Sequence, residues 1–155
     1  MKTIKNLPFA AVAASALTLL FQTSPARADN SAPVQLTFEK TLAGTGPAPY
    51  LFHFTGTFGG DFTGQLYVGM LVREFIDAQH QLVHVVADYF FTADDGIHSF
   101  TARVEGDSNF HKGDAVLNGV VTAGWLEGAQ VQDHFEILGG GHFQGTFRIM
   151  PASAD

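Results

Sequence analysis

The chain has 155 residues, with 15 acidic and 8 basic side chains and a formal net charge of −7. This balance argues against a nucleic acid or an anionic membrane surface as partner, because phosphate binding needs clustered Lys and Arg. The chain has no cysteine, which excludes a disulfide scaffold, a thiolate zinc site and a cysteine nucleophile. Its 46% hydrophobic content suffices for a packed core and argues against disorder.

Residues 1–28 have the three parts of a bacterial export signal. Lys2 and Lys5 precede an apolar run over 9–21, and small residues at Ala26 and Ala28 suit cleavage before Asp29. The run is too short for the roughly 20 residues of a spanning helix. We therefore expect a signal peptide over 1–28, a single domain over 29–155, and a periplasmic or secreted protein with no membrane contact after processing.

The remaining chain alternates apolar and polar residues with period two, and no segment shows a convincing helical period. Bounded runs predict eight strands, near 33–40, 49–58, 61–75, 79–93, 96–107, 114–122, 124–137 and 142–150. The connections contain turn residues, such as Gly59-Gly60-Asp61 and Asp94-Asp95-Gly96. The break at 44–49 is the longest, and we expect a mobile flap there.

Short connections between consecutive strands favour antiparallel pairing. The predicted fold class is therefore all-β, a single eight-stranded antiparallel up-and-down barrel, since closure removes exposed strand edges. A two-sheet sandwich is the alternative. A Phe-x-Gly pattern recurs at Gly56, Gly64 and Gly145, and predicts strongly coiled strands at barrel corners, with Phe rings over bare backbone.

The segment Gly124-Trp125-Leu126-Glu127-Gly128-Ala129 resembles the Gly-aromatic hairpin of the dirigent and allene oxide cyclase-like barrels, and 143–149 is similar to their closing strand. The likeness covers about the last 70 residues. It implies binding of apolar or phenolic small molecules, in some members with a steered cyclisation or radical coupling, and often association into homo-oligomers. The functional acidic residues of that group do not align with particular positions here.

The interior of an eight-stranded barrel is either filled or holds one small ligand. Aromatic side chains on inward positions suit a flat or apolar ligand. The aromatic residues assigned to the interior are Phe52, Phe54, Phe90, Phe100, Trp125, Phe135 and Phe147. Most of them are equally explained as ordinary core.

Polar residues in step with apolar neighbours are the candidates for chemistry, because burying them is costly unless they are paired. Asp88, His98 and Glu127 are the candidate catalytic groups, and Asp133 is a candidate ligand contact. With a three-residue turn at 94–96, Phe90 would face Phe100 and Asp88 would face Ala102. A carboxylate in an aromatic cavity would have a raised pKa and could act as general acid or base. Each candidate can equally be a wetted group at a barrel mouth.

No metal site or cofactor is predicted. His80 and His84 would lie ~13 Å apart along a strand, and no His-x-His pair or Gly-x-Ser-x-Gly elbow occurs. We therefore expect an exported barrel that binds a small apolar or aromatic molecule, with a cofactor-free isomerase or cyclase activity left open. The alternative is a non-catalytic interaction or structural barrel with a packed core and an acidic outer face.

Overall fold

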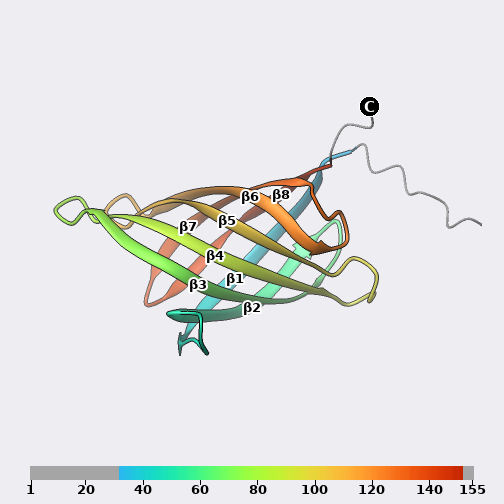
Figure 1. The fold of residues 1–155 in the computed structure, drawn as a ribbon, viewed down its shortest axis with the longest axis horizontal. Helices are drawn as coiled ribbons and strands as arrows, with labels where there is room; N and C mark the ends of the chain where they lie inside the picture. The colour runs from blue at the N-terminus through green and yellow to red at the C-terminus, as the bar shows by residue number, and fades with distance from the viewer. Residues whose placement is uncertain (1–31, 152–155) are drawn as a thin grey trace, which may run out of the picture.

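The computed structural model describes residues 32–151, which form a closed barrel of eight strands and contain no helix (Figure 1). The strands are β1 (Val34–Thr45), β2 (Phe52–Gly60), β3 (Gly64–Asp77), β4 (Leu82–Ala93), β5 (Phe100–Asn109), β6 (Asp114–Gly124), β7 (Gln130–Gly139) and β8 (His142–Met150). Each strand pairs antiparallel with its neighbours in sequence, and β8 pairs with β1. The predicted fold class is confirmed, and the sandwich is excluded. The predicted signal peptide lies outside the described residues.

Three predicted boundaries differ from the structure by four or more residues, and several others differ by two or three. β1 runs five residues further, to Thr45, through an irregularity between Leu42 and Gly44. β5 begins at Phe100 and not at 96, so the turn after β4 is longer than the predicted three residues. β7 begins at Gln130, because 125–128 form a turn closed by backbone hydrogen bonds such as Gly128 N to Val121 O at 2.9 Å. These differences alter which side chains face inward.

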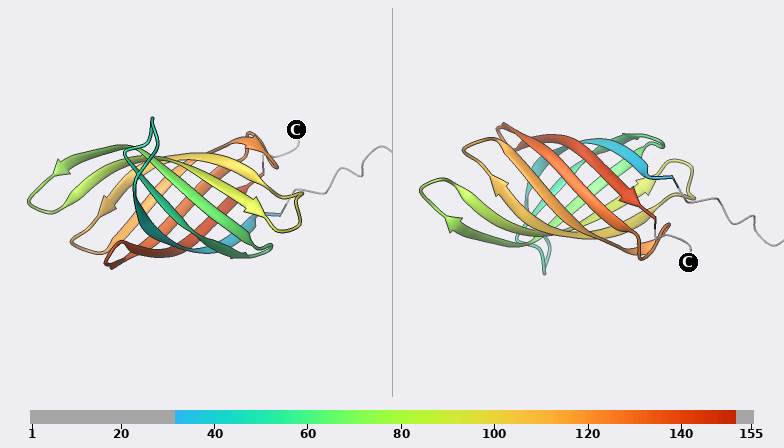
Figure 2. Two further views of the ribbon diagram at one scale, coloured as in Figure 1. Left: turned by 90° about the horizontal axis from the view of Figure 1, so that it is seen from below. Right: turned by 90° about the horizontal axis from the view of Figure 1, so that it is seen from above.

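The two ends of the barrel are different. The turns β1–β2, β3–β4, β5–β6 and β7–β8 lie at one end, which we call the open end. The other three turns lie at the opposite end, where β1 begins and β8 ends; we call it the closed end. The β3–β4 hairpin projects beyond the other strands at the open end (Figure 2).

Stacked aromatic rings fill the barrel interior toward the closed end. The rings of Phe91 and Phe100 are stacked with centroids 4.4 Å apart, and the ring of Phe147 lies 4.8 Å from Phe91. Phe58 packs edge-on against Phe91 at 5.1 Å. Burial of these rings supplies much of the apolar core. These rings pack directly against one another, and a separate hollow of about 300 Å³ at the closed end is lined by other residues, Phe62, His98 and Trp125 among them.

The recurring Phe-x-Gly glycines lie where neighbouring backbones approach closely. A Cβ on Gly56 would lie 1.9 Å from the carbonyl oxygen of Glu39, and one on Gly145 would lie 2.4 Å from that of His134. The ring of Phe58 lies over Gly64, 2.7 Å from the place of a Cβ there. Glycine is required at these positions for strand approach, which lets the sheet coil tightly enough to close.

Candidate ligand-binding site

A cavity of about 390 Å³ occupies the open-end half of the barrel, above the packed rings. All eight strands contribute to its walls, which are mainly apolar and aromatic. Phe52, Phe54, Phe135 and Phe143 are among the rings that line it. The volume falls within the range of roughly 300–1,000 Å³ typical of small-molecule sites.

Lys40 is the charged side chain at the inner part of this cavity. It follows Leu36 and Phe38 on the inward face of β1 and is only 5% exposed. Its ammonium nitrogen lies 4.2 Å from the ring centre of Phe135 and 4.4 Å from that of Tyr89. The amine also donates a hydrogen bond to the Tyr89 hydroxyl. Cation–π contacts and this hydrogen bond partly replace the water that the amine has lost.

Asp133 is buried next to Lys40 and Tyr89, at the inward position of β7 that precedes Phe135. It is fully buried, and neither carboxyl oxygen has a hydrogen-bond partner of good geometry among the described residues. Burial raises the pKa of Asp133 from its ordinary 3.8 to about 6, although the Lys40 charge and the nearby Tyr89 hydroxyl act in the opposite direction. An unbonded buried carboxyl is rare, and it is costly unless another group compensates.

Burial has the complementary effect on the amine and the phenol. It lowers the pKa of Lys40 from 10.5 to about 8, despite the opposing charge of Asp133. It also raises the pKa of Tyr89 well above 10, so this hydroxyl keeps its proton. Lys40 and Asp133 therefore titrate on either side of neutral pH. Together with Tyr89 they form one polar cluster in an otherwise apolar interior.

Arg73 and two aromatic rings stand at the mouth of the cavity. The guanidinium of Arg73 on β3 lies 5.0 Å from the ring centre of Phe75 and 5.9 Å from that of Phe110. Arg73 and Phe110 line the cavity, as does the glycine turn 139–141. The mouth is thus bordered by a fixed positive charge and by backbone without side chains.

The predicted inward orientation of Asp88 is wrong. Asp88 lies on the outer face of β4, where it forms a two-point ion pair with Arg103, with Oδ1 to Nε at 2.8 Å and Oδ2 to Nη2 at 3.0 Å. The Tyr50 hydroxyl donates to the same carboxylate at 3.2 Å. Asp88 faces Arg103 and not Ala102, because the longer turn shifts the pairing of β4 with β5 by one residue. Phe90, on the same parity, is also outside, against Tyr50 and Tyr67.

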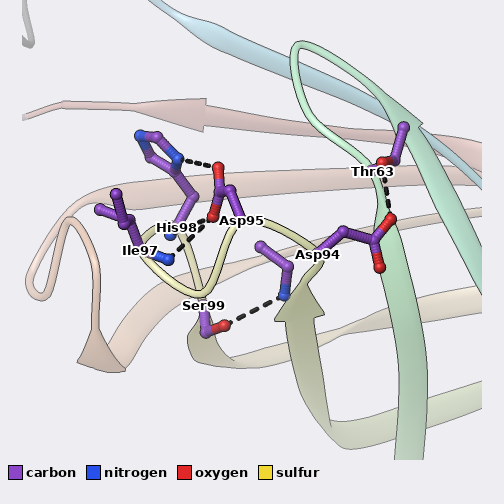
Figure 3. Close-up of polar contacts among 7 residues, drawn as sticks. Thr63, Asp94, Asp95, Ile97, His98 and Ser99 are labelled. Carbon is purple, nitrogen blue, oxygen red and sulfur yellow. Dashed lines mark hydrogen bonds and ion pairs between the residues drawn. The ribbon is translucent and has the colours of Figure 1, made fainter.

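His98, Glu127 and Trp125 lie at the closed end, away from the cavity. His98 belongs to the β4–β5 turn, and its Nδ1 contacts the Asp95 carboxylate at 2.5 Å (Figure 3). Its ring stacks on Phe62 at 5.1 Å and meets Trp125 edge-on at 4.5 Å. Glu127 is exposed in the β6–β7 turn. The structure therefore does not bring Asp88, His98 and Glu127 together.

The remaining predicted residues do face inward. Phe52, Phe54 and Phe135 line the cavity, whereas Phe100 and Phe147 belong to the packed half. Asp133 is buried in the interior, as its parity predicts.

Sequence reasoning missed Lys40 and Tyr89, although a signal for each is present. Lys40 is in step with Leu36 and Phe38 but ends the predicted strand, where a lysine normally reaches solvent. Tyr89 is in step with Val83, Val85, Ala87, Phe91 and Ala93, an unbroken apolar series. The other parity of β4 also contains Val86 and Phe90, which made the two faces hard to distinguish.

The other polar clusters and hollows lie at the surface or at the closed end, where Phe62, His98 and Trp125 line a hollow of about 300 Å³. Among residues 32–151, no three His, Asp or Glu side chains are placed to hold a metal ion. His80 contacts Asp77 at 2.6 Å and His84 contacts Asp107 at 3.2 Å, both at the surface. A larger hollow of about 570 Å³ lies over the outer face of β1, β2, β7 and β8. Exposed polar side chains such as Glu39 and Glu136 border it, so it is less suited to an apolar ligand.

Comparison with known proteins identifies no family: no family model matches the chain, and no curated protein matches its sequence. Within the described part of the chain, no helix is long and apolar enough to cross a membrane.

Proposed function

We propose that this protein binds one small, mainly apolar or aromatic molecule in the open-end cavity. The observation that carries the proposal is the Lys40 amine, which reaches an otherwise aromatic cavity and is held there by Tyr89. Binding sites of this kind combine apolar walls with a few polar groups that fix the orientation of the ligand. The ligand is expected to direct one polar group toward Lys40 and its apolar part toward the mouth.

The proposal extends to a cofactor-free isomerisation or cyclisation of the bound molecule. Lys40 and Asp133 have pKa values of about 8 and about 6, and groups that titrate near the working pH are the most effective in proton transfer. Lys40 would exchange a proton with the ligand directly, and Asp133 would act through Lys40 and Tyr89. Confinement between rings would orient the reacting atoms. The resemblance to allene oxide cyclase-like barrels supports the same reaction class.

The second candidate is a non-catalytic interaction or structural barrel. The observation in its favour is the closed-end half of the interior, where the rings of Phe91, Phe100 and Phe147 pack directly against one another. Under this hypothesis the remaining cavity is incidental, and partners would bind the acidic outer face. The two candidate functions predict different effects on ligand affinity when a larger side chain fills the cavity.

A probe-binding experiment separates them. The neutral fluorescent probe N-phenyl-1-naphthylamine is titrated into the wild type, Ala87→Leu and Thr92→Leu. Ala87 is buried on the cavity wall, whereas Thr92 is exposed on the same strand. We expect stoichiometric binding that Ala87→Leu weakens roughly tenfold, or about 1.4 kcal/mol, and that Thr92→Leu leaves unchanged. Equal binding by all three proteins, with circular dichroism showing intact folds, would favour the structural barrel.

We also propose export to the periplasm or medium, on the sequence of residues 1–28. The intact mass of the protein from the medium or periplasm of an expressing bacterium tests this proposal. A chain that begins at Asp29 supports it, and a chain that retains 1–28 in the cytoplasm contradicts it. Native mass spectrometry of the same preparation would reveal a co-purifying ligand and the number of subunits.

A further inference from the structure

We propose that the ligands of this cavity are small aromatic or apolar aldehydes, which Lys40 captures reversibly as an imine. This inference rests on the proposed binding function and specifies its substrate class. It assigns Lys40 a covalent role in addition to its electrostatic one.

The position of the amine carries the inference. Lys40 projects from β1 into the interior opposite Gly56, which has no side chain to cover it. Residues 32–151 contain two lysines, Lys40 and Lys112, and Lys112 is exposed in the β5–β6 turn. The rings of Phe38, Phe54 and Phe135 surround the buried Lys40 amine, and they would bind the apolar part of an aldehyde. Such a site would hold the carbonyl carbon next to the amine nitrogen and so raise the effective concentration of the aldehyde.

The reaction needs no oxidant or reductant. The neutral Lys40 nitrogen attacks the carbonyl carbon to form a C–N bond while the C=O π bond opens, and one proton passes from the nitrogen to the carbonyl oxygen to give a carbinolamine. The C–O bond then breaks, water leaves with the hydroxyl and one further proton, and the nitrogen loses its remaining proton to give the C=N bond. Amine and aldehyde thus become imine and water, and added water reverses the sequence.

The neighbours of Lys40 can assist both the formation of the carbinolamine and its dehydration to the imine. The Tyr89 hydroxyl contacts the Lys40 nitrogen and keeps its proton, so it can donate to the oxygen that develops negative charge. Asp133 lies behind this pair and can store the proton released by the amine. Asp133 does not line the cavity, and we regard it as a positioning residue that acts through Lys40 and Tyr89.

The protonation state of Lys40 supports the assignment. Desolvation lowers the pKa of this amine to about 8, so near neutral pH the nucleophilic form is far more abundant than for an exposed lysine. The charged or titratable groups that face Lys40 are Asp133 on β7 and Tyr89 on β4, with Arg73 of β3 at the mouth. The side chains that face it from β2 and β8 are the apolar Phe54 and Phe143.

Charge favours an aldehyde over a carboxylic acid. Asp133 already compensates the Lys40 charge inside the barrel. A bound carboxylate would place two buried anions against one buried cation, at a large desolvation cost. A neutral carbonyl adds no charge. When the amine becomes a neutral imine, Asp133 can take up the proton that the amine releases, so no buried carboxylate is left without a compensating charge.

The test is reductive trapping at pH 7.5 with trans-cinnamaldehyde and sodium cyanoborohydride, read by intact mass and peptide mapping. The processed wild type, Lys40→Arg and Lys112→Arg are compared, and the N-terminal amine is mapped separately. We expect Lys40 to be labelled at least tenfold faster than Lys112. Lys112→Arg should keep this labelling and Lys40→Arg should lose it. Excess cinnamyl alcohol, which cannot form an imine, should slow labelling of Lys40 and not of Lys112.

Displacement of N-phenyl-1-naphthylamine by cinnamyl alcohol separates failure of this inference from failure of the proposed function. If the alcohol displaces the probe and Lys40 is labelled no faster than Lys112, imine formation is refuted and the binding function stands. If neither probe nor alcohol binds and Lys40 is not labelled, both proposals are refuted. The competition experiment uses wild-type protein only, so the result does not depend on whether Lys40→Arg folds.

Discussion

The amine of Lys40 on β1 donates a hydrogen bond to the Tyr89 hydroxyl on β4, across the interior of the barrel. These strands are not neighbours in the sheet, so the contact spans the space between opposite parts of the wall. Asp133 is buried beside this contact, and neither of its carboxyl oxygens has a hydrogen-bond partner within residues 32–151. Burying these polar groups destabilises the folded state, and the effect on the free energy of unfolding can be measured without any ligand.

The buried pair should give stability a minimum near neutral pH. The pKa of Asp133 is raised, so its contribution is full below about 3.8 and is lost as the pH rises through about 6. The pKa of Lys40 is lowered, so its contribution is full above about 10.5 and is lost as the pH falls through about 8. Each contribution is on the order of 3 kcal/mol. Urea unfolding at pH 4, 7 and 9.5 measures the free energy of unfolding at the minimum and on its acidic and alkaline sides.

The control for this profile is the double variant Lys40→Met/Asp133→Leu, which removes both titrating groups. Its stability relative to wild type should be greatest at pH 7 and should decline toward pH 4 and 9.5. A difference that is constant over this range would contradict the assigned pKa shifts.

Removing only Lys40 or only Asp133 should lower the free energy of unfolding more than removing both residues. Lys40→Met leaves Asp133 buried without its compensating charge, and we expect a loss of roughly 3 kcal/mol at pH 8. The loss should be smaller at pH 5, where Asp133 is already protonated. The double variant should recover most of the stability, since apolar replacements of buried ion pairs are often neutral or stabilising. Thermal unfolding of the two single variants and the double variant gives the coupling energy, and additive losses would contradict the pairing.

Asp88→Ala should affect stability and not ligand binding. The variant removes the contacts of Arg103 and Tyr50 with the Asp88 carboxylate on the outer face. The ion pair joins the 56% exposed side chain of Arg103 to the 11% exposed side chain of Asp88. Solvent screens it only in part, and the expected loss is on the order of 1–2 kcal/mol. The measurements are chemical unfolding and probe titration. A weakened affinity for the probe without loss of fold would show that Asp88 reaches the cavity after all.

The close approach at Gly145 predicts a sharp contrast between two glycine variants. In Gly145→Ala the new Cβ would lie 2.4 Å from the His134 carbonyl oxygen and 2.6 Å from the Phe135 Cβ, neither of which can move freely. We expect a loss of about 2 kcal/mol or more. At Gly59 the nearest atom is the Thr37 Oγ1 at 3.8 Å, so Gly59→Ala should be nearly neutral. Comparable losses for both variants would argue against the predicted barrel coiling.

Trp125 should report on the closed end of the barrel and not on the ligand. It is the single tryptophan of the chain and contacts Phe62 and His98, far along the barrel from the cavity residues. Saturation of the cavity with cinnamyl alcohol should leave its emission maximum and acrylamide quenching unchanged, whereas His98→Ala should alter both. A ligand-dependent shift in wild type would place the binding site at the closed end.

The amino-acid sequence by itself determined the all-β class, the number of strands and the closed antiparallel barrel. Period-two alternation and turn residues are local properties, and eight short-connected strands remove their edges most simply by closing. The same local reasoning placed Phe52, Phe54, Phe135 and Asp133 inside. The Phe-x-Gly repeat predicted strongly coiled strands with Phe rings over bare backbone, whereas the close backbone approaches at Gly56 and Gly145 are seen only in the structure.

Only the tertiary structure decided which polar residues meet. β4 carries apolar residues on both faces, so the choice between Asp88 and Tyr89 as the inward group depended on its pairing with β5. The length of the 94–99 turn set that pairing, and a shift of one residue exchanges the two faces of a strand. Lys40 joined the cluster because β1 continues past it to Thr45. Its partners Tyr89 and Asp133 come from distant strands, and barrel closure alone brings them to the same point.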